Sequence, residues 1–326
     1  MLRRHFITFV GGATVSWPLA AHAQKLPPLI GFLGNQSPPP PNDAQGNALF
    51  QGFRDSGLLV GRDFIFEPHF TDGDDTRFPV FVRELARKNV HMILANTPAG
   101  VRAAQQLEPP VPVLMVNLND PVREGLIASL ARPGGHTTGT ASLNADVTPK
   151  LLEFLREILP KATVLAVIFN PSNPSNPVLL DTLQARANPL GITVLPFATK
   201  SLGDLDAVFP ELVARHPDAL QIIGDPLLSD SGDRITELAI ANRLPTFTNN
   251  EPAVEASGLV CYGASVRKVL HRMGYYVKRV LDGANPGELP VEQPTGLDLI
   301  INLKTAKTLG IDVSPTLLAR ADRVIE

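Results

Sequence analysis

Short apolar runs alternate along this chain with longer stretches whose apolar positions recur at helical spacing. The runs that predict strands occupy residues 29–33, 64–66, 91–95 and 111–116 in the first half, and 164–169, 193–197, 219–223 and 259–262 in the second. Helices are expected at 43–56, 78–88, 99–107, 121–130, 149–159, 178–188, 204–215 and 235–243. Gly57 ends the first of these helices, in which Leu49, Phe50 and Phe53 share one face.

The order of these elements predicts an α/β fold. Continuous rather than alternating apolar strands indicate a sheet that is covered on both faces. Strands that alternate with helices indicate βαβ units and a parallel sheet. Two such sets of similar size predict two Rossmann-like, doubly wound lobes that are joined by a multi-strand hinge. We expect lobe 1 at 26–140 plus 264–294, lobe 2 at 141–263, and a hinge-crossing segment at 295–326, with Arg132-Pro133-Gly134-Gly135 as a clear break near the first boundary.

The first 23 residues have the features of an export signal. Arg3 and Arg4 precede a mostly apolar stretch at 6–19, and Ala21-His22-Ala23 supplies the small-x-small pattern of a cleavage site. The stretch is short and rich in glycine for a permanent membrane span. The two arginines fit either an ordinary Sec signal or a twin-arginine signal, and both alternatives stay open. The sequence therefore predicts export to the periplasm and leaves residues 1–23 out of the fold.

Composition fits an exported, soluble protein. Removal of the signal leaves about 300 residues, enough for two domains of ordinary size. The net charge is −3 and no basic stripe is present, so we expect no nucleic acid as a partner. No later run of roughly 18 apolar residues indicates a membrane span. Cys261 is the single cysteine, so it forms no internal disulfide, and its apolar neighbours favour a buried packing role. We expect a monomer.

The sequence motifs of several enzyme classes are absent. The segment 31–36 after the first strand lacks the G-x-G-x-x-G of dinucleotide sites, and the chain has neither a P-loop nor a G-x-S-x-G nucleophile elbow. None of the seven histidines pairs with another ligand at a recognised metal spacing. Asp74 and Asp75 fit a solvated turn with an N-cap better than an acid–base pair. We therefore expect no catalytic residue, no metal and no cofactor.

Polar loops follow the predicted strands at their carboxyl ends, the edge at which open α/β sheets bind ligands. Their side chains suit a ligand held by hydrogen bonds, and the alternative is that they only cap the helices that follow. The predicted ligand-binding residues in these loops are Asn35, Gln36, Ser37, Thr97, Pro98, Ala99, Asp120, Asn170 and Asp225. Thr97 lies at a helix start that suits a ligand carboxylate, and Asp225 suits a ligand ammonium.

Two aromatic residues complete the predicted site. The only tryptophan, Trp17, lies in the signal, and the chain has three tyrosines. Phe70 and Tyr262 each end a predicted strand, from which either ring can stack on a flat ligand and exclude water. A tyrosine packed under the hinge is an equally good interpretation of Tyr262.

Several sequence blocks resemble a known family. They are the signal start with Trp17-Pro18-Leu19-Ala20, the segments at 30–33 and 120–139, the pairs Asn170-Pro171, Asp225-Pro226 and Tyr262-Gly263, and the tail at 299–307. Together they resemble the ABC transporter substrate-binding proteins of the TrpX-like (ABC_sub_bind) family over essentially the whole chain. The resemblance implies a periplasmic binding protein fold of type I and hinge closure on a small molecule. Some members of the family take aromatic amino acids.

The resemblance implies a function and a set of partners. The chain would be the exported solute-binding subunit of a bacterial ABC importer, capturing a small molecule such as an amino acid or an aromatic compound. Its partners would be an ABC permease and an ATPase subunit. Two alternatives stay open: a ligand sensor for a receptor kinase, and an exported Rossmann-like transferase, for which no phosphate loop is visible.

Overall fold

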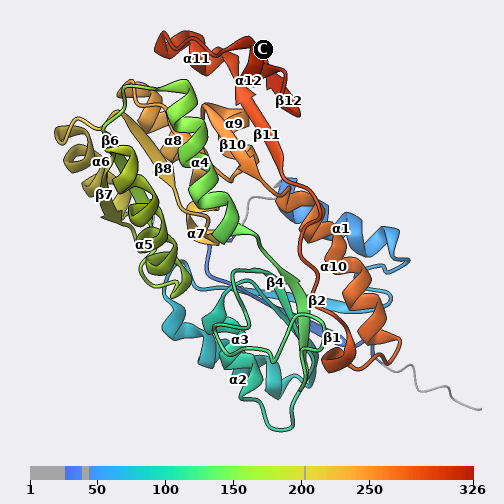
Figure 1. The fold of residues 1–326 in the computed structure, drawn as a ribbon. Coiled ribbons are helices and arrows are strands. Elements are labelled where there is room, and N and C mark those ends of the chain that lie inside the picture. Colours follow the sequence, from blue (N-terminus) through green and yellow to red (C-terminus); the bar gives the residue numbers. More distant parts are fainter. Residues whose placement is uncertain (1–25, 39–43, 202) are drawn as a thin grey trace, which may run out of the picture.

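The computed structural model describes residues 26–38, 44–201 and 203–326, with side chains omitted at 44–46. The predicted signal at 1–23 and part of the proline run at 38–41 lie outside the described residues. The described chain forms two lobes, each built around its own sheet (Figure 1). The predicted fold class, two doubly wound α/β lobes, is confirmed. Within the described residues, no helix is both long enough and apolar enough to cross a membrane.

The first lobe is built on a parallel sheet of five strands in the order β2-β1-β3-β4-β5. Its strands are β1 (Leu29–Gly34), β2 (Ile65–Phe70), β3 (Val90–Ala95), β4 (Val113–Leu118) and β5 (Thr137–Ala141). Its helices are α1 (Ala44–Asp55), α2 (Phe78–Arg87), α3 (Pro98–Gln105) and α10 (Val266–Leu281), with short 3-10 turns η1 (Asp75–Arg77) and η3 (Pro286–Glu288). Helix α10 comes late in the chain and packs beside α1 (Figure 1).

Alternate strand positions fill two separate cores in this lobe, because successive side chains of a strand point to opposite faces. Ile30 and Leu94 lie in the core under α1 and α10, together with Phe53 and Met273. Leu33 and other strand residues lie in the core under α2 and α3. Two apolar faces explain why the strands read as continuous apolar runs in the sequence.

The second lobe is built on a sheet of seven strands in the order β12-β11-β10-β9-β8-β6-β7. Its strands are β6 (Val164–Phe169), β7 (Thr193–Ala198), β8 (Ala219–Ile222), β9 (Thr246–Thr248), β10 (Val260–Gly263), β11 (Asp298–Asn302) and β12 (Arg323–Ile325). Its helices are α4 (Asn144–Ile158), α5 (Ser175–Ala187), α6 (Asp204–Ala214), α7 (Pro226–Asp230), α8 (Gly232–Ala241), α9 (Glu251–Ala256), α11 (Leu303–Leu309) and α12 (Pro315–Leu318), with the 3-10 turn η2 (Asn188–Leu190). Strand β11 runs antiparallel to β10, and the other pairs are parallel.

Three segments connect the lobes. They lie between β5 and α4, between β10 and α10, and between η3 and β11. The first and third run side by side, since Ala141 N–H donates to Glu292 O at 2.9 Å and Gln293 Nε2 donates to Ser142 O at 3.3 Å. The segment after 295 thus enters the second sheet as β11 and β12. The residue boundaries given above for the lobes stay a prediction.

The region between β4 and β5 differs from its prediction. The helix expected at 121–130 is wrong, because those residues form successive turns. Gly125 adopts φ +68°, which an α-helix does not allow, and Ala128 N–H donates to Pro133 O at 2.8 Å instead. Strand β5 was not expected, because Thr137–Ala141 contains threonine and glycine in place of large apolar residues.

Candidate functional site

A cavity of about 530 Å³ lies between the two lobes, at the carboxyl ends of their strands. The first lobe contributes Gln36 after β1, Phe70 at the end of β2, Asn96 after β3 and Asn117 near the end of β4. The second lobe contributes Asn173 after β6, Asp225 after β8 and Asn249 after β9. The predicted sheet edge is therefore the edge that forms the cavity, and both lobes line it.

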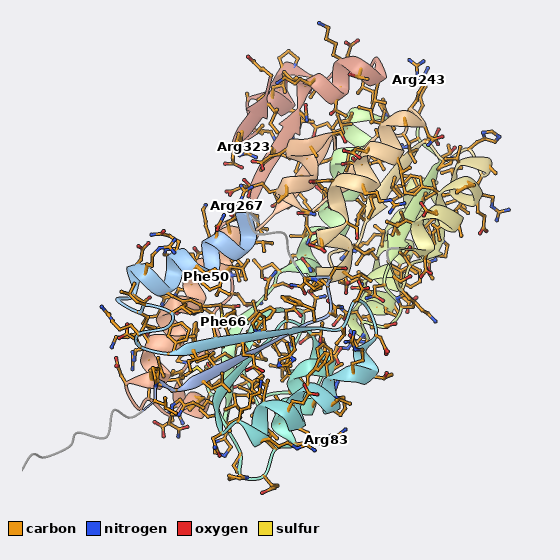
Figure 2. The ribbon with its side chains drawn as sticks, turned by 180° about the vertical axis from the view of Figure 1, so that it is seen from behind. Phe50, Phe66, Arg83, Arg243, Arg267 and Arg323 are labelled. Carbon is orange, nitrogen blue, oxygen red and sulfur yellow. The ribbon has the colours of Figure 1, made fainter. Side chains whose placement is uncertain are left out.

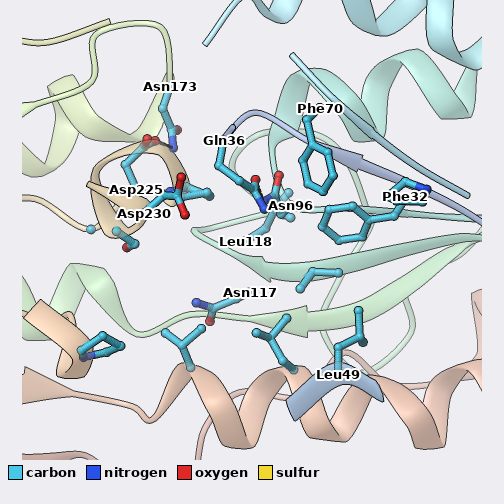
Figure 3. A pocket seen from close by; sticks show the side chains of 18 of the residues that line it. Phe32, Gln36, Leu49, Phe70, Asn96, Asn117, Leu118, Asn173, Asp225 and Asp230 are labelled. Atoms are coloured by element: carbon cyan, nitrogen blue, oxygen red, sulfur yellow. Dashed lines mark hydrogen bonds between the residues drawn. The ribbon is translucent and has the colours of Figure 1, made fainter. Parts of the chain in front are cut away.

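Aromatic rings form the wall on the side of the first lobe. Phe32 and Phe70 lie with ring centroids 5.9 Å apart, and both line the cavity. Phe50 of α1 meets Phe66 of β2 edge-on at 5.6 Å, which anchors the helix to the sheet behind them (Figure 2). Leu49 lies on the same helix and also lines the cavity (Figure 3). This wall suits a flat apolar group, which can stack on the rings.

Asp225 is the centre of the polar wall on the side of the second lobe. Its side chain caps α7, accepting from Leu227 N–H at 3.0 Å, while Pro226 occupies the first helical position. Asn170 Nδ2 donates to one carboxylate oxygen at 3.1 Å, and Asn173 Nδ2 donates to the other at 2.8 Å. The residue is only 4% exposed, and this burial raises the pKa of the carboxyl group above its usual value.

Asn117 is held in an unusual backbone conformation at the floor of the cavity. Its φ is +57°, in the left-handed region where asparagine is one of the few tolerated side chains. The β4–β5 register shifts between Met115 and Leu118, and Asn117 N–H donates to Thr140 Oγ1 at 2.9 Å in place of a ladder bond. The side-chain Oδ1 is buried and has no hydrogen-bond partner in the protein. Backbone strain of this kind persists only where the surrounding structure enforces it, and it is common at functional sites.

A chain of three amides crosses from one lobe to the other beside the cavity. Asn249 Nδ2 donates to Asn144 Oδ1 at 2.7 Å, and Asn144 Nδ2 donates to Asn119 Oδ1 at 2.8 Å. Asn119 follows β4 in the first lobe, Asn144 begins α4 next to the hinge, and Asn249 follows β9. Of the two bonds, Asn144 to Asn119 crosses between the lobes, and Asn249 to Asn144 lies within the second lobe.

Four of the residues predicted from the sequence line the cavity: Gln36, Phe70, Pro98 and Asp225. Gln36 Oε1 accepts from Asn96 Nδ2 at 2.8 Å, so its amide is fixed in the middle of the site (Figure 3). Pro98 lines it as the first residue of α3.

The other seven predicted residues lie outside the cavity lining. They are Asn35, Ser37, Thr97, Ala99, Asp120, Asn170 and Tyr262. Thr97 is the N-cap of α3 and accepts from Gly100 N–H at 3.1 Å, as the capping alternative expected. Asp120 is exposed and accepts from Arg123 N–H at 3.1 Å in a turn.

Two of these seven support the site or the core instead, and Ser37 bonds to an exposed partner. Asn170 lies behind Asp225 as its donor. Tyr262 packs against Phe154, with ring centroids 5.1 Å apart, in the core of the second lobe, which is the second interpretation given for it. Ser37 donates to Asp72. A loop at a strand end offers some side chains to the cleft and turns others inward, and residue type alone does not separate them.

Some lining residues were missed. Asn144, Asp230, Asp233 and Asn249 all line the cavity. Their only sequence signal was position: Asn249-Asn250 follows the three-residue strand β9, which was too short for an apolar run to reveal, and Asp230 ends the five-residue helix α7.

Asp74 and Asp75 behave differently from each other. Asp74 accepts from Thr76 N–H at 3.2 Å and caps η1, as predicted. Asp75 is not a solvated turn residue: burial, and then the charge of Asp225 across the cleft, raise its pKa to about 6. Thr71 Oγ1 donates to it at 3.4 Å, a bond that opposes the shift only weakly.

We expect Asp75→Asn to stabilise the protein at neutral pH. A carboxyl pKa raised from 3.8 to about 6 means that the folded protein holds this proton more tightly than the unfolded chain does. The free-energy cost of ionising Asp75 in the folded protein is absent below pH 3.8, grows as the pH rises to about 6, and is fully present above that. The variant should gain about 1 kcal/mol at pH 7.5, allowing for solvent screening, and nothing at pH 3.5. Melting curves at both pH values, with the exposed Asp312→Asn as control, check this; an equal gain at both would contradict it.

Comparisons with known proteins agree with this architecture. The tyrosine-binding protein of Clostridioides difficile strain R20291 is 29% identical over 273 residues, 83% of this chain and 78% of that one. A conserved domain protein from Vibrio cholerae has a TM-score of 0.80 at 22% identity, covering 91% of this chain and 99% of that one. An ABC domain from Streptococcus pneumoniae, solved with L-tryptophan, has a TM-score of 0.78 at 21% identity, with coverage of 92% and 100%.

A third solved structure is the ligand-free, open form of a Clostridium difficile substrate-binding protein with adhesive properties. Its TM-score is 0.60 at 23% identity, with coverage of 91% and 99%. The family model described as ABC transporter substrate binding protein matches residues 40–325. Because that match covers almost all of the 326 residues, the chain belongs to the family of ABC transporter substrate-binding proteins, whose members bind solutes and are not enzymes.

Proposed function

We propose that this protein is the exported solute-binding subunit of an ABC importer and works in the periplasm. It captures a small molecule in the cavity between its lobes and delivers it to a membrane permease that an ATPase drives. The observation that carries the proposal is the cavity of about 530 Å³ that both lobes line at their strand ends. A volume in this range suits a small organic ligand.

The proposed mechanism is closure of the two lobes about the three-segment hinge. The ligand lands on one lobe, and contacts from the other stabilise the closed state. The chain superposes better on the tryptophan complex, at a TM-score of 0.78, than on the ligand-free open structure, at 0.60. Together with the amide chain from Asn119 to Asn249, this supports the closed arrangement as the one seen here.

For this site we propose Gln36, Phe70, Pro98 and Asp225 as ligand contacts, joined by the lining residues Asn117 and Asn173. Asn170 then holds Asp225 in place, and Thr97 caps the helix that Pro98 begins. A relative named for tyrosine and a neighbour solved with L-tryptophan support a ligand with an aromatic ring. The aromatic wall of Phe32 and Phe70 supports the same choice.

Uptake measurements in the source bacterium test the proposal. Deletion of the gene should abolish uptake of the solute that raises the melting temperature of the purified protein. A solute at 100 times its Kd adds about 2.7 kcal/mol, a shift of several degrees. Fractionation should place the mature protein in the periplasm. If uptake is unchanged in the deletion strain although the purified protein binds the solute, the sensor alternative is favoured.

A second contact between the lobes gives a prediction for closure. Ser175 Oγ in the second lobe donates to Glu124 Oε1 in the first at 3.2 Å, and Arg102 Nη2 lies 3.0 Å from the other oxygen of the same carboxylate. Glu124→Ala removes this contact from the closed state only. A hydrogen bond of about 1 kcal/mol corresponds to roughly fivefold faster release of ligand in stopped-flow measurements. The control is Glu153→Ala, at an exposed position. Equal rates of ligand release in the two variants would contradict a role of the Ser175–Glu124 contact in closure.

A further inference from the structure

The turn between β2 and η1 touches the second lobe. Gly73 in this turn adopts φ +85°, and a Cβ added to it would lie 2.5 Å from Lys200 O. The same Cβ would lie 3.8 Å from Leu227 Cδ2. Lys200 follows β7 and Leu227 belongs to α7, so both atoms are part of the second lobe. The backbone of the turn therefore lies against the opposite lobe, at a distance that favours glycine.

This contact lies on the side of the cleft away from the hinge. β2 is the edge strand of the first sheet opposite β5, from which the chain crosses to the second lobe. β7 is likewise the edge strand of the second sheet remote from β10 and β11, where the other two connecting segments attach. Rotation about the hinge displaces this side of the cleft most. Opening of the lobes therefore breaks the contact between Gly73 and Lys200.

The turn brings a carboxylate to the same contact. Asp75 begins η1, and Asp225 caps α7, the helix to which Leu227 belongs. Burial first, then the charge of Asp225 and more weakly that of Asp74, raise the pKa of Asp75 to about 6. Thr71 Oγ1 donates to Asp75 at 3.4 Å, which opposes this shift only in part. Two carboxylates on opposite lobes thus approach each other when the lobes are together.

The cations around this turn do not compensate the charge of Asp75. The charged side chains on the elements packed around it are Asp72, Asp74 and Arg77 on its own turn, Lys200 after β7, and Asp225 and Asp230 of α7. The guanidinium of Arg77 donates to Thr71 O at 3.2 Å. The ammonium of Lys200 lowers the pKa of Asp204 instead. The first turn of α2 carries no charge, and the groups that shift the pKa of Asp75 include no cation among the described residues.

We propose that the lobes take up a proton at Asp75 when they close on the Gly73 turn. In the open state Asp75 faces water, away from Asp225, and ionises as an ordinary carboxylic acid. In the closed state the two carboxylates hold a proton between them, which solvent supplies and which returns to solvent on opening. Acidic conditions then favour closure and capture, and neutral or alkaline conditions favour release. The inference rests on the proposed closure mechanism and adds a proton to it.

Linkage gives the sign and the size of the effect. An acid whose pKa is higher in the closed state than in the open state makes closure more favourable as the pH falls. We take a pKa of about 6 for Asp75 in the closed state and its ordinary value of 3.8 in the open state. The equilibrium constant for closure then rises by up to about tenfold from pH 7.5 to pH 5.0.

Titration calorimetry with L-tryptophan at pH 7.5 and 5.0 measures this coupling, because the solute stays a zwitterion at both values. Acidification should raise the affinity of the unaltered mature protein several-fold, up to about tenfold, relative to that of Asp75→Asn. At pH 7.5 the variant should bind more tightly than the unaltered protein. Asp72→Asn makes the same change at an exposed position of the same turn and should follow the unaltered protein. An equal pH dependence in Asp75→Asn and the unaltered protein overturns the proposal.

Small-angle scattering of the ligand-free mature protein needs no solute. From pH 7.5 to pH 5.0 the radius of gyration should fall in the unaltered protein and in Asp72→Asn, and stay constant in Asp75→Asn. If L-tryptophan does not bind, this measurement decides: a radius that does not fall in the unaltered protein, or that falls equally in Asp75→Asn, overturns the proposal. The importer proposal fails separately, if no solute in a broad thermal-shift screen stabilises the protein.

Gly73→Ala and Gly61→Ala together test the contact itself. Both glycines have φ +85°, so alanine costs similar backbone strain at each, and a Cβ at Gly61 meets nothing within 4 Å. Gly73→Ala pushes the Lys200 backbone away, so L-tryptophan affinity should fall tenfold or more and the radius of gyration at pH 5.0 should be larger. Gly61→Ala should leave both unchanged. Equal behaviour of the two variants in scattering overturns the contact on which the proposal depends.

Discussion

Gly274→Ala should destabilise the first lobe by about 3 kcal/mol, at the upper end of the usual cost of overpacking. An added Cβ at Gly274 of α10 would lie 1.9 Å from Gly52 O of α1, and one at Gly52 would lie 2.0 Å from His271 O. Both obstacles are backbone atoms, so no rotamer change can make room and the two helices must separate. That separation opens the core formed by Phe53, Met273 and Tyr276.

The measurement is a thermal melt, in which a loss of this size lowers Tm by roughly 6–12 °C. Gly296→Ala is the matched control: it makes the same chemical change in a segment where an added Cβ meets nothing within 4 Å. The control should melt within a degree or two of the unaltered protein. If Gly274→Ala melted with the control, the close approach of α1 and α10 would be refuted.

The sequence predicted the two-lobed fold because its signal is local and repeated. Each buried strand, such as β6 with its six apolar residues, has two covered faces and therefore stands out from the amphipathic helices around it. The predictions failed where the backbone conformation, and not the pattern of apolar side chains, determines the structure. Gly125 turns the chain at a point where helix-forming residues surround it, and the backbone of β5 passes so close to Met115 O that only Gly139, at φ +128°, fits there.

The binding edge could be predicted, but its contacts could be predicted only in part. The rule that ligands lie at the carboxyl ends of parallel strands located the loops that form the cavity. It did not say which residues of a loop face inward: Thr97 caps its helix, while its neighbour Pro98 lines the cavity. Nor did it single out Asn117 within its loop, because the left-handed backbone that aims this residue depends on the β4–β5 register shift.

The hydrogen bonds at the junction of the lobes could not be predicted from the sequence either. Asn119, Asn144 and Asn249 are separated by up to 130 positions along the chain (249 − 119), and only the folded protein brings them into one hydrogen-bonded chain. None of the three stands out by type, since asparagines are common in loops. Their role follows from the positions that the two sheets give them.

Gly224→Ala should break this amide chain and weaken ligand binding roughly fivefold. Gly224 lines the cavity, and an added Cβ would lie 2.3 Å from Asn249 Nδ2 and 2.7 Å from Asn144 Nδ2. Both obstacles are the ends of flexible side chains, so the fold can persist while the two amides move away. The closed state then loses one hydrogen bond between the lobes, Asn144 to Asn119, of about 1 kcal/mol, and each 1.4 kcal/mol is tenfold in affinity.

Two measurements separate this effect from general destabilisation. Titration of the tightest-binding solute should show the weaker affinity. Small-angle scattering should show that the variant needs more of that solute to reach the compact, closed form. Gly203→Ala is the control in the same lobe, since its added Cβ meets only Ser201 Oγ, at an ordinary 3.7 Å. Its affinity should equal that of the unaltered protein. Because the amides hold the lobes together whatever the ligand is, the loss should be similar for every solute that closes the cleft. A loss confined to a single solute would instead make Asn144 and Asn249 direct contacts to that ligand.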